Sequence, residues 1–310
     1  MNKKRGSVLI LTMWVLFLLA LLTLGLKTHV DARVRASGIL KHQVHGRYLA
    51  RAGASMATRI LRADTNHWDG LGEPWTEEGV HREEVGVTRW LIEDEESRLN
   101  LNRTGPVIMT RFFRDVGGLS ELEAESVVAS IIDWRDEDDE ARPGGAESGF
   151  YESRPAGYPA RNGSFASIHE LLLVKGVDNG LFSRIRSNIT VHGAGHINVN
   201  TASREVLLAL ARTVEGPGEQ GAGSLVEKIL DVREQNEVFK AIVWSDIAAR
   251  LSLSEVETLI FRRMSDHLTV RSSYFTGFCE ADIGDDGRVE HQVRFTLHRE
   301  SGQVVGWYEE

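Results

Sequence analysis

The chain opens with two hydrophobic patterns in succession. Three basic residues, a Gly-Ser pair and an uncharged apolar run fill residues 3–26, and Lys27 closes the run. As a helix, the run of about 19 residues is roughly 28 Å long, close to the ~30 Å hydrocarbon core of a bilayer. We therefore predict a membrane span from Val8 to Leu26 that includes Leu11 and Trp14. Its basic flank should stay in the cytoplasm, with the rest of the chain on the other side.

The second pattern covers residues 30–61, which contain no proline. Apolar residues recur there at helical spacing: Val30, Val34, Leu40, Val44, Tyr48, Ala52, Met56 and Ile60, with Leu49 and Ala57 beside them. One helix over residues 8–61 would be roughly 80 Å long. We expect its first half to cross a membrane and its amphipathic second half to pack on a globular domain.

The first residues allow three interpretations. A cleaved secretory signal has an apolar stretch of about 7–15 residues and an A-x-A-like site, and neither is found here. A plain signal anchor fits the length of the run. A short basic leader ending in Gly6, directly before Ser7 and the apolar run, resembles a type IV prepilin leader, which prepilin peptidase would cut after Gly6.

The later residues predict an α+β fold. We expect a loop over residues 67–84, a strand over 84–94 and mostly helix over 110–266, with capping boxes at Ser120, Ser167 and Ser254. Strand character returns at residues 267–271, 274–283, 289–298 and 304–309. The chain thus divides into a leader (1–6), a long N-terminal helix (7–65), a first pilin-like α/β segment (66–102), a large inserted α-helical domain (103–265) and a β-meander (266–310) that completes an antiparallel sheet.

Composition narrows the possible functions. Hydrophobic residues make up 42% and charged residues 26% of the chain, as in globular proteins. The net charge of −9 argues against nucleic acid as the main partner. Because Cys279 is the single cysteine, no intramolecular disulfide can form, and a metal ion is one candidate for bracing the long loops.

Residues 133–152 carry the strongest candidate chemistry. Eight acidic residues face only Arg135 and Arg142, and a Pro-Gly-Gly turn can fold Glu147 back onto the aspartates. Hard oxygen ligands on a flexible loop suit Ca²⁺, whereas zinc would need cysteine or histidine. The spacing is not that of an EF-hand. A solvated acidic loop remains an alternative, and so does a carboxylate pair for acid–base catalysis. No nucleophile or oxyanion hole accompanies such a pair, so we expect no enzyme here.

Several segments together resemble the K-type minor pseudopilin of the type II secretion system. They are the KKRG leader with its apolar run and the segments at residues 92–102 (IEDEESRLNLN), 131–148 (IIDWRDEDDEARPGGAES), 167–177 (SIHELLLVKGV) and 197–210 (INVNTASREVLLAL). The resemblance covers nearly the whole chain. It implies a methylated, inner-membrane subunit with a periplasmic globular part, at the tip of a pseudopilus built with I-type, J-type and other pseudopilins.

The resemblance also implies calcium in the acidic loop, with Asp136, Asp138, Asp139 and Glu147 as the ligand positions. Ala141 and Ser148 depart from the family pattern, which more often has Pro and Asp there.

A second departure concerns Leu11. Most pilins carry Glu at the fifth mature position, and if Ser7 is the first mature residue, the fifth is Leu11. The missing Glu fits a subunit with no other subunit above it, because an unpaired charge in hydrocarbon is costly.

The alternative function is that of a signal-anchored periplasmic protein that binds DNA. Residues 171–177 and 197–210 are similar to helix-hairpin-helix segments, in which backbone amides hold a phosphate. Basic residues are not clustered near them, however, so we interpret both as packing segments.

Overall fold

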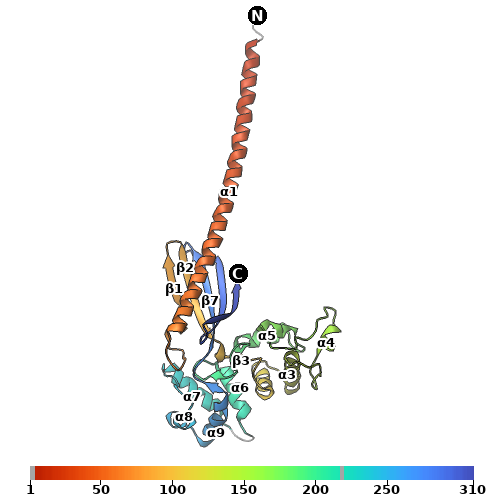
Figure 1. Ribbon diagram of the computed structural model, residues 1–310, viewed down its shortest axis with the longest axis vertical. Helices are drawn as coiled ribbons and strands as arrows, with labels where there is room; N and C mark the ends of the chain where they lie inside the picture. Colours follow the sequence, from red (N-terminus) through yellow and green to blue (C-terminus); the bar gives the residue numbers. More distant parts are fainter. Residues whose placement is uncertain (1–3, 217–219) are drawn as a thin grey trace.

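The computed structural model describes residues 4–216 and 220–310, and one helix dominates its shape (Figure 1). This helix, α1, spans Lys4–Ala63 without interruption. Its first half projects freely from the globular part, and residues 8–44 are exposed almost throughout. The predicted long helix is therefore confirmed. Gly6 and Ser7 lie in its first turns, but their side chains lie outside the described part of the structure.

Five antiparallel strands form the main sheet, in the order β1-β2-β7-β8-β9. Their bounds are Gly79–Glu83, Gly86–Asp94, Tyr274–Ile283, His291–His298 and Gln303–Glu309. The expected loop over residues 67–84 was wrong at its end, because β1 forms a hairpin with β2 there. The three long predicted strands after residue 273 are confirmed within a few residues, whereas residues 267–271 supply only the two-residue strand β6 (Leu268–Thr269).

The lower half of α1 covers one face of this sheet through a row of small residues. Its buried positions are Gly46, Leu49, Ala50, Gly53, Ala54, Ala57 and Leu61. At Gly53 a Cβ atom would lie 2.4 Å from Oγ1 of Thr88 in β2, so only glycine permits this close approach. The predicted packing face is confirmed in its lower part, where Leu49 and Ala57 are buried and Met56 and Ile60 pack against the same core. It is wrong above that point: Val44 and Tyr48 are 44% and 67% exposed, on the side of α1 opposite the buried residues.

The helical part is inserted between β2 and β7. Its α-helices are α2 (Pro106–Asp115), α3 (Glu121–Arg135), α4 (Ser148–Glu152), α5 (Asn179–Ile185), α6 (Arg204–Val214), α7 (Ala222–Glu234), α8 (Trp244–Arg250) and α9 (Glu255–Met264). Capping boxes open α3 at Ser120 and α9 at Ser254 as predicted. Ser167 instead begins a 3-10 helix, η3 (Ile168–Leu173), where its hydroxyl accepts from the amide of His169. Short 3-10 helices η1 (Pro74–Thr76), η2 (Glu95–Ser97), η4 (Arg186–Asn188) and η5 (Ser265–His267) complete the connections.

The insertion has its own hydrophobic core, separate from the core between α1 and the sheet. The two segments similar to helix-hairpin-helix motifs contribute to it through Leu171, Val174, Val206, Leu207 and Leu210, all buried. The second of these segments begins as a strand, β5 (Ile197–Asn198), paired in parallel with β6. A matching ladder joins β3 (Leu99–Asn100) to β4 (Ile189–Thr190). The burial of the leucine and valine side chains in the two segments similar to helix-hairpin-helix motifs supports a packing role for both segments.

Candidate metal centre

The acidic loop begins where α3 ends. Asp136 is the C-cap residue of α3, and the loop turns back at Gly144, whose φ of +81° favours glycine. The amide of Gly145 donates to the carbonyl of Arg142 at 2.8 Å, and Glu147 then forms the N-cap of α4. The predicted fold-back is thus present: the helix and turn bring Glu147 to the aspartates.

Three of the four proposed ligand residues come together. Carboxylate oxygens of Asp136, Asp138 and Glu147 all lie within 4.8 Å of one another. Asp139 is exposed and lies outside this group. A group of this kind offers the oxygen-only ligands that Ca²⁺ prefers. We call Asp136, Asp138 and Glu147 the loop cluster.

The loop cluster contains buried oxygens without protein partners. Both carboxylate oxygens of Glu147 and Oδ1 of Asp136 are buried and accept no hydrogen bond. Buried polar atoms are normally paired, so converging carboxylate oxygens without protein donors fit a cation or ordered water. Burial, and then the charge of Asp133 and the loop aspartates, raises the pKa of Glu147 to about 7. A bound cation would remove that repulsion.

Asp133 and Arg142 support the loop from behind. Asp133 is fully buried, and Nη1 of Arg142 donates to its Oδ1 at 2.8 Å and also binds Oδ2 of Asp136. A Cβ atom on Gly145 would lie only 2.0 Å from Oδ2 of Asp133, so this position requires glycine. Sequence reasoning counted Asp133 among the acidic residues but did not give it this positioning role. Its place one turn before Asp136, on the buried side of α3, was the available signal.

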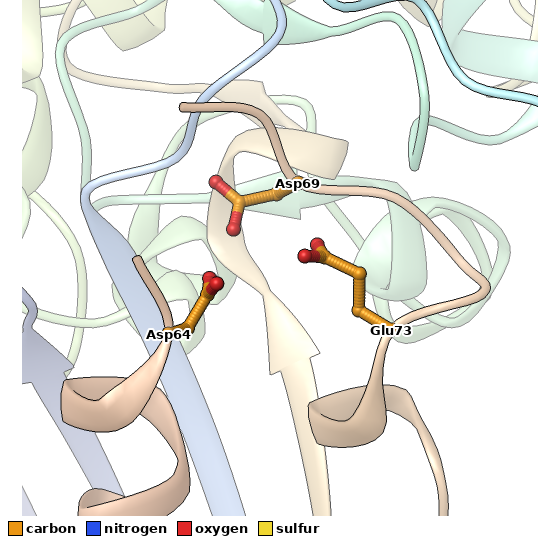
Figure 2. A group of neighbouring side chains, drawn as sticks. All are labelled: Asp64, Asp69 and Glu73. Atoms are coloured by element: carbon orange, nitrogen blue, oxygen red, sulfur yellow. The ribbon is translucent and has the colours of Figure 1, made fainter. Parts of the chain in front are cut away.

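A second acidic group, missed from the sequence, lies where α1 meets the sheet (Figure 2). Figure 2 shows the carboxylates of Asp64, Asp69 and Glu73 pointing toward one another from the end of α1, the following loop and the residue before η1. Their oxygens also approach within 4.8 Å. We call these three residues the junction cluster. In the sequence these residues are spread over a polar segment without a recognisable motif, which is why the sequence did not indicate the cluster.

The junction cluster already contains a cation. The guanidinium of Arg299, 7% exposed, binds Oδ1 of Asp69 and lies 3.4 Å from Oδ2 of Asp64. Glu73 accepts from the amide of Gly70 and the indole of Trp75, both at 3.0 Å. Asp69 also accepts from the amide of Ser272 at 2.6 Å. Of its carboxylate oxygens only Oδ2 of Asp64 accepts no hydrogen bond, and Arg299 lies beside it, so the protein itself supplies the partners that a metal ion would otherwise provide.

The apolar half of α1 contains the predicted membrane span, Val8 to Leu26. It is the one helix in residues 4–216 and 220–310 long and apolar enough to cross a membrane. Val8, Leu11, Trp14 and Leu26 are all 60% or more exposed, as expected of side chains that await lipid or neighbouring helices. This half fits a single-pass membrane anchor.

Comparisons with known proteins identify the relationship. Residues 94–194, which include the acidic loop, match the family model "Type II secretion system (T2SS), protein K". Type II secretion system protein K of Klebsiella pneumoniae is 22% identical over 98% of this chain and 95% of its own length. The protein of the same name from Pseudomonas aeruginosa is 27% identical over 70% of this chain and 71% of its own.

A solved structure has the same fold. One chain of the GspK-GspI-GspJ complex from enterotoxigenic Escherichia coli superimposes with a TM-score of 0.66, at 18% identity, over 91% of this chain and 99% of its own. The α+β fold with its long helix and antiparallel sheet is shared. With the family model over residues 94–194 and the relatives, this confirms the resemblance found in the sequence: the chain is similar, over nearly its whole length, to type II secretion system protein K.

Proposed function

We propose that this chain is a minor pseudopilin at the tip of the type II secretion pseudopilus, where it supports fibre assembly and protein export across the outer membrane. Its anchor lies in the inner membrane, its globular part in the periplasm, and I-type and J-type minor pseudopilins are its direct partners. The neighbouring structure, a GspK-GspI-GspJ complex, supports this choice of partners. The observation that carries the proposal is that one face of α1 packs on the chain's own sheet, whereas the opposite apolar face is exposed.

Two faces of α1 have different roles. The small-residue face from Gly46 to Leu61 is used by the chain's own sheet. On the opposite side Val30, Val34, Leu40, Val44 and Tyr48 remain 44–67% exposed. A long apolar stripe left in water is unfavourable by about 25 cal/mol for each Å² that a partner could cover. A parallel helix from a neighbouring subunit would cover it and continue the contact into the bilayer.

The tip position rests on Leu11. In the proposed mature chain, which begins at Ser7, Leu11 stands where most pilins carry a glutamate. Leu11 is 64% exposed on the apolar half of α1 and offers no carboxylate to the N-terminal ammonium of a subunit above it. Adding this subunit beneath another would leave that ammonium unpaired in hydrocarbon, which costs several kcal/mol. The chain is therefore suited to be the first subunit of the pseudopilus, with the other subunits added beneath it.

Calcium is proposed as the ion of the loop cluster. Asp136, Asp138 and Glu147 would hold it, and their orphaned buried oxygens fit a hard divalent cation. Binding only the folded loop, the ion would stabilise the insertion. Arg142 binds Asp133 and Asp136 and so holds the start of the loop against α3.

Co-expression tests the proposal. The full-length chain, with I-type and J-type subunits and prepilin peptidase from the same organism, should be cut after Gly6 and should retain both subunits on purification. A Gly6→Val variant should stay uncut, whereas Gly25→Ala, a glycine with open space around it in the same helix, should be processed normally. Normal cutting of the Gly6 variant, or a processed chain that retains neither subunit, would contradict the proposal.

A further inference from the structure

The strand β9 is an open edge of the main sheet. It pairs with β8 on one side, and no strand in the described parts of the chain pairs with its other side. Gln292 and Glu310 exchange both backbone hydrogen bonds. Because bonded and non-bonded pairs alternate in an antiparallel ladder, the backbone groups of Trp307 and Glu309 point outward.

The protection of this edge is limited to a register shift that leaves Val305 without a partner on β8, and to the single charge of Glu309. The sequence of β9, QVVGWYE, contains no lysine, arginine or proline, and Val304, Val305, Trp307 and Tyr308 are 45–59% exposed. The opposite edge strand, β1, has the sequence GVHRE and binds Asp285 through Arg82. Open edges are normally covered by charge, so the exposed apolar residues of β9 mark a surface that another chain covers.

The exposed stripe of α1 continues onto β9. Glu309 accepts from Nε of Arg47 at 2.8 Å and from Nε of Arg51 at 2.6 Å, which fixes β9 beside α1 (Figure 1). Arg47 and Arg51 each lie three residues after an exposed stripe residue, Val44 and Tyr48, so they are its neighbours on the helix surface. Stripe and strand therefore form one continuous surface.

The membrane anchor restricts which chain can pair with β9. This step rests on the proposed function. A neighbour in the same membrane whose long helix runs parallel to α1 along the stripe must carry its globular part alongside β9. A second copy cannot pair its β9 antiparallel to this one, because the required two-fold axis would point its anchor away from the membrane. We infer that β9 is the site at which the adjacent minor pseudopilin adds an edge strand to this sheet.

A charge-insertion experiment tests the inference on the full-length chain co-expressed with the I-type and J-type subunits. The double variant Val305→Lys and Tyr308→Lys places gatekeeper charges on β9, and Val80→Lys places one at a 49% exposed valine on β1. We expect the β9 variant to retain at least about tenfold less of one partner, which corresponds to about 1.4 kcal/mol, and the β1 variant to behave as wild type. Thermal melting should leave all three chains folded alike.

Cross-linking provides the second measurement and covers a β9 variant that fails to fold. In a chain with Val305→Cys, the native Cys279 is buried and unreactive, so a short bifunctional maleimide should capture a subunit with an engineered edge-strand cysteine. Equal partner retention by the β9 and β1 variants, or capture of a second copy of this chain, would overturn the inference. If the wild-type chain itself retains no partner, the proposed function fails and the inference fails with it.

Discussion

Two acidic clusters in this molecule have similar geometry and different surroundings. In both, three carboxylates approach within 4.8 Å. In the junction cluster Arg299 is buried among the carboxylates, and donors from the loop, η1 and Ser272 satisfy most oxygens. In the loop cluster the one arginine, Arg142, is 43% exposed at its side chain and reaches Asp133 and Asp136 but not Glu147. The difference teaches that proximity of carboxylates alone does not indicate a metal site. Buried oxygens without protein donors are the better sign, and the loop cluster has three of them whereas the junction cluster has one, Oδ2 of Asp64.

The largest expected effect comes from removing the built-in cation. Arg299→Met leaves Asp69, fully buried, without its partner, and breaking a buried ion pair in this way costs about 3–5 kcal/mol. Urea unfolding of the full-length protein in detergent should show that loss. Arg204→Met is the control: it removes an ion pair with Glu227 in which both side chains are about half exposed, so the carboxylate stays solvated and the loss should be far smaller. Equal losses would mean that Arg299 is not the buried cation that the junction cluster needs.

Chelation should act on the loop cluster alone. At a calcium concentration of about 100 times Kd, binding contributes about 2.7 kcal/mol, and excess EGTA should remove it and lower Tm. Glu147→Gln should abolish the response to EGTA, whereas Glu73→Gln should keep it. A wild-type melting curve that EGTA leaves unchanged would count against the metal.

The pKa of Glu147 gives a smaller, pH-dependent effect. Its folded pKa of about 7 is raised above the usual 4.5, so the metal-free folded protein binds a proton that the unfolded chain releases between these values. The contribution of Glu147 to the stability of the metal-free protein should therefore be fully present below pH 4.5 and be lost as pH rises through 7, a change that the Glu147→Gln variant should not show. Calcium must displace the same proton, so its Kd should increase about tenfold per pH unit below 7. Calorimetry at pH 6 and pH 8 checks this, and a pH-independent Kd would contradict it.

The smallest effect concerns the helix that carries the aspartates. Ser120→Ala removes the N-cap of α3, at a cost of about 1 kcal/mol, and should weaken calcium binding slightly because Asp136 ends that helix. Ser254→Ala removes the same kind of capping box from α9 and should cost a similar amount without changing calcium affinity. Titrations of both variants would separate general stability from support of the loop cluster.

Local signals in the sequence predicted the parts that depend on local chemistry. The apolar run, the capping serines of α3 and α9 and the turn at Gly144 each specify a structure over a few residues. The packing face of α1 was predicted correctly at Leu49 and Ala57 but wrongly at Val44 and Tyr48, because close helix–sheet approach selects glycine at positions such as Gly53, whereas size favoured the larger residues. The junction cluster was missed because Arg299 reaches Asp69 across 230 residues of chain.

Direct measurement of bound calcium tests the comparison of the two clusters most directly. Equilibrium dialysis of the purified full-length protein against radioactive calcium, for the wild type, Glu147→Gln and Glu73→Gln, compares both clusters in one experiment. The account predicts that the Glu147 variant loses the bound calcium while the Glu73 variant retains the wild-type amount. Calcium retained by the Glu147 variant and lost by the Glu73 variant would contradict it.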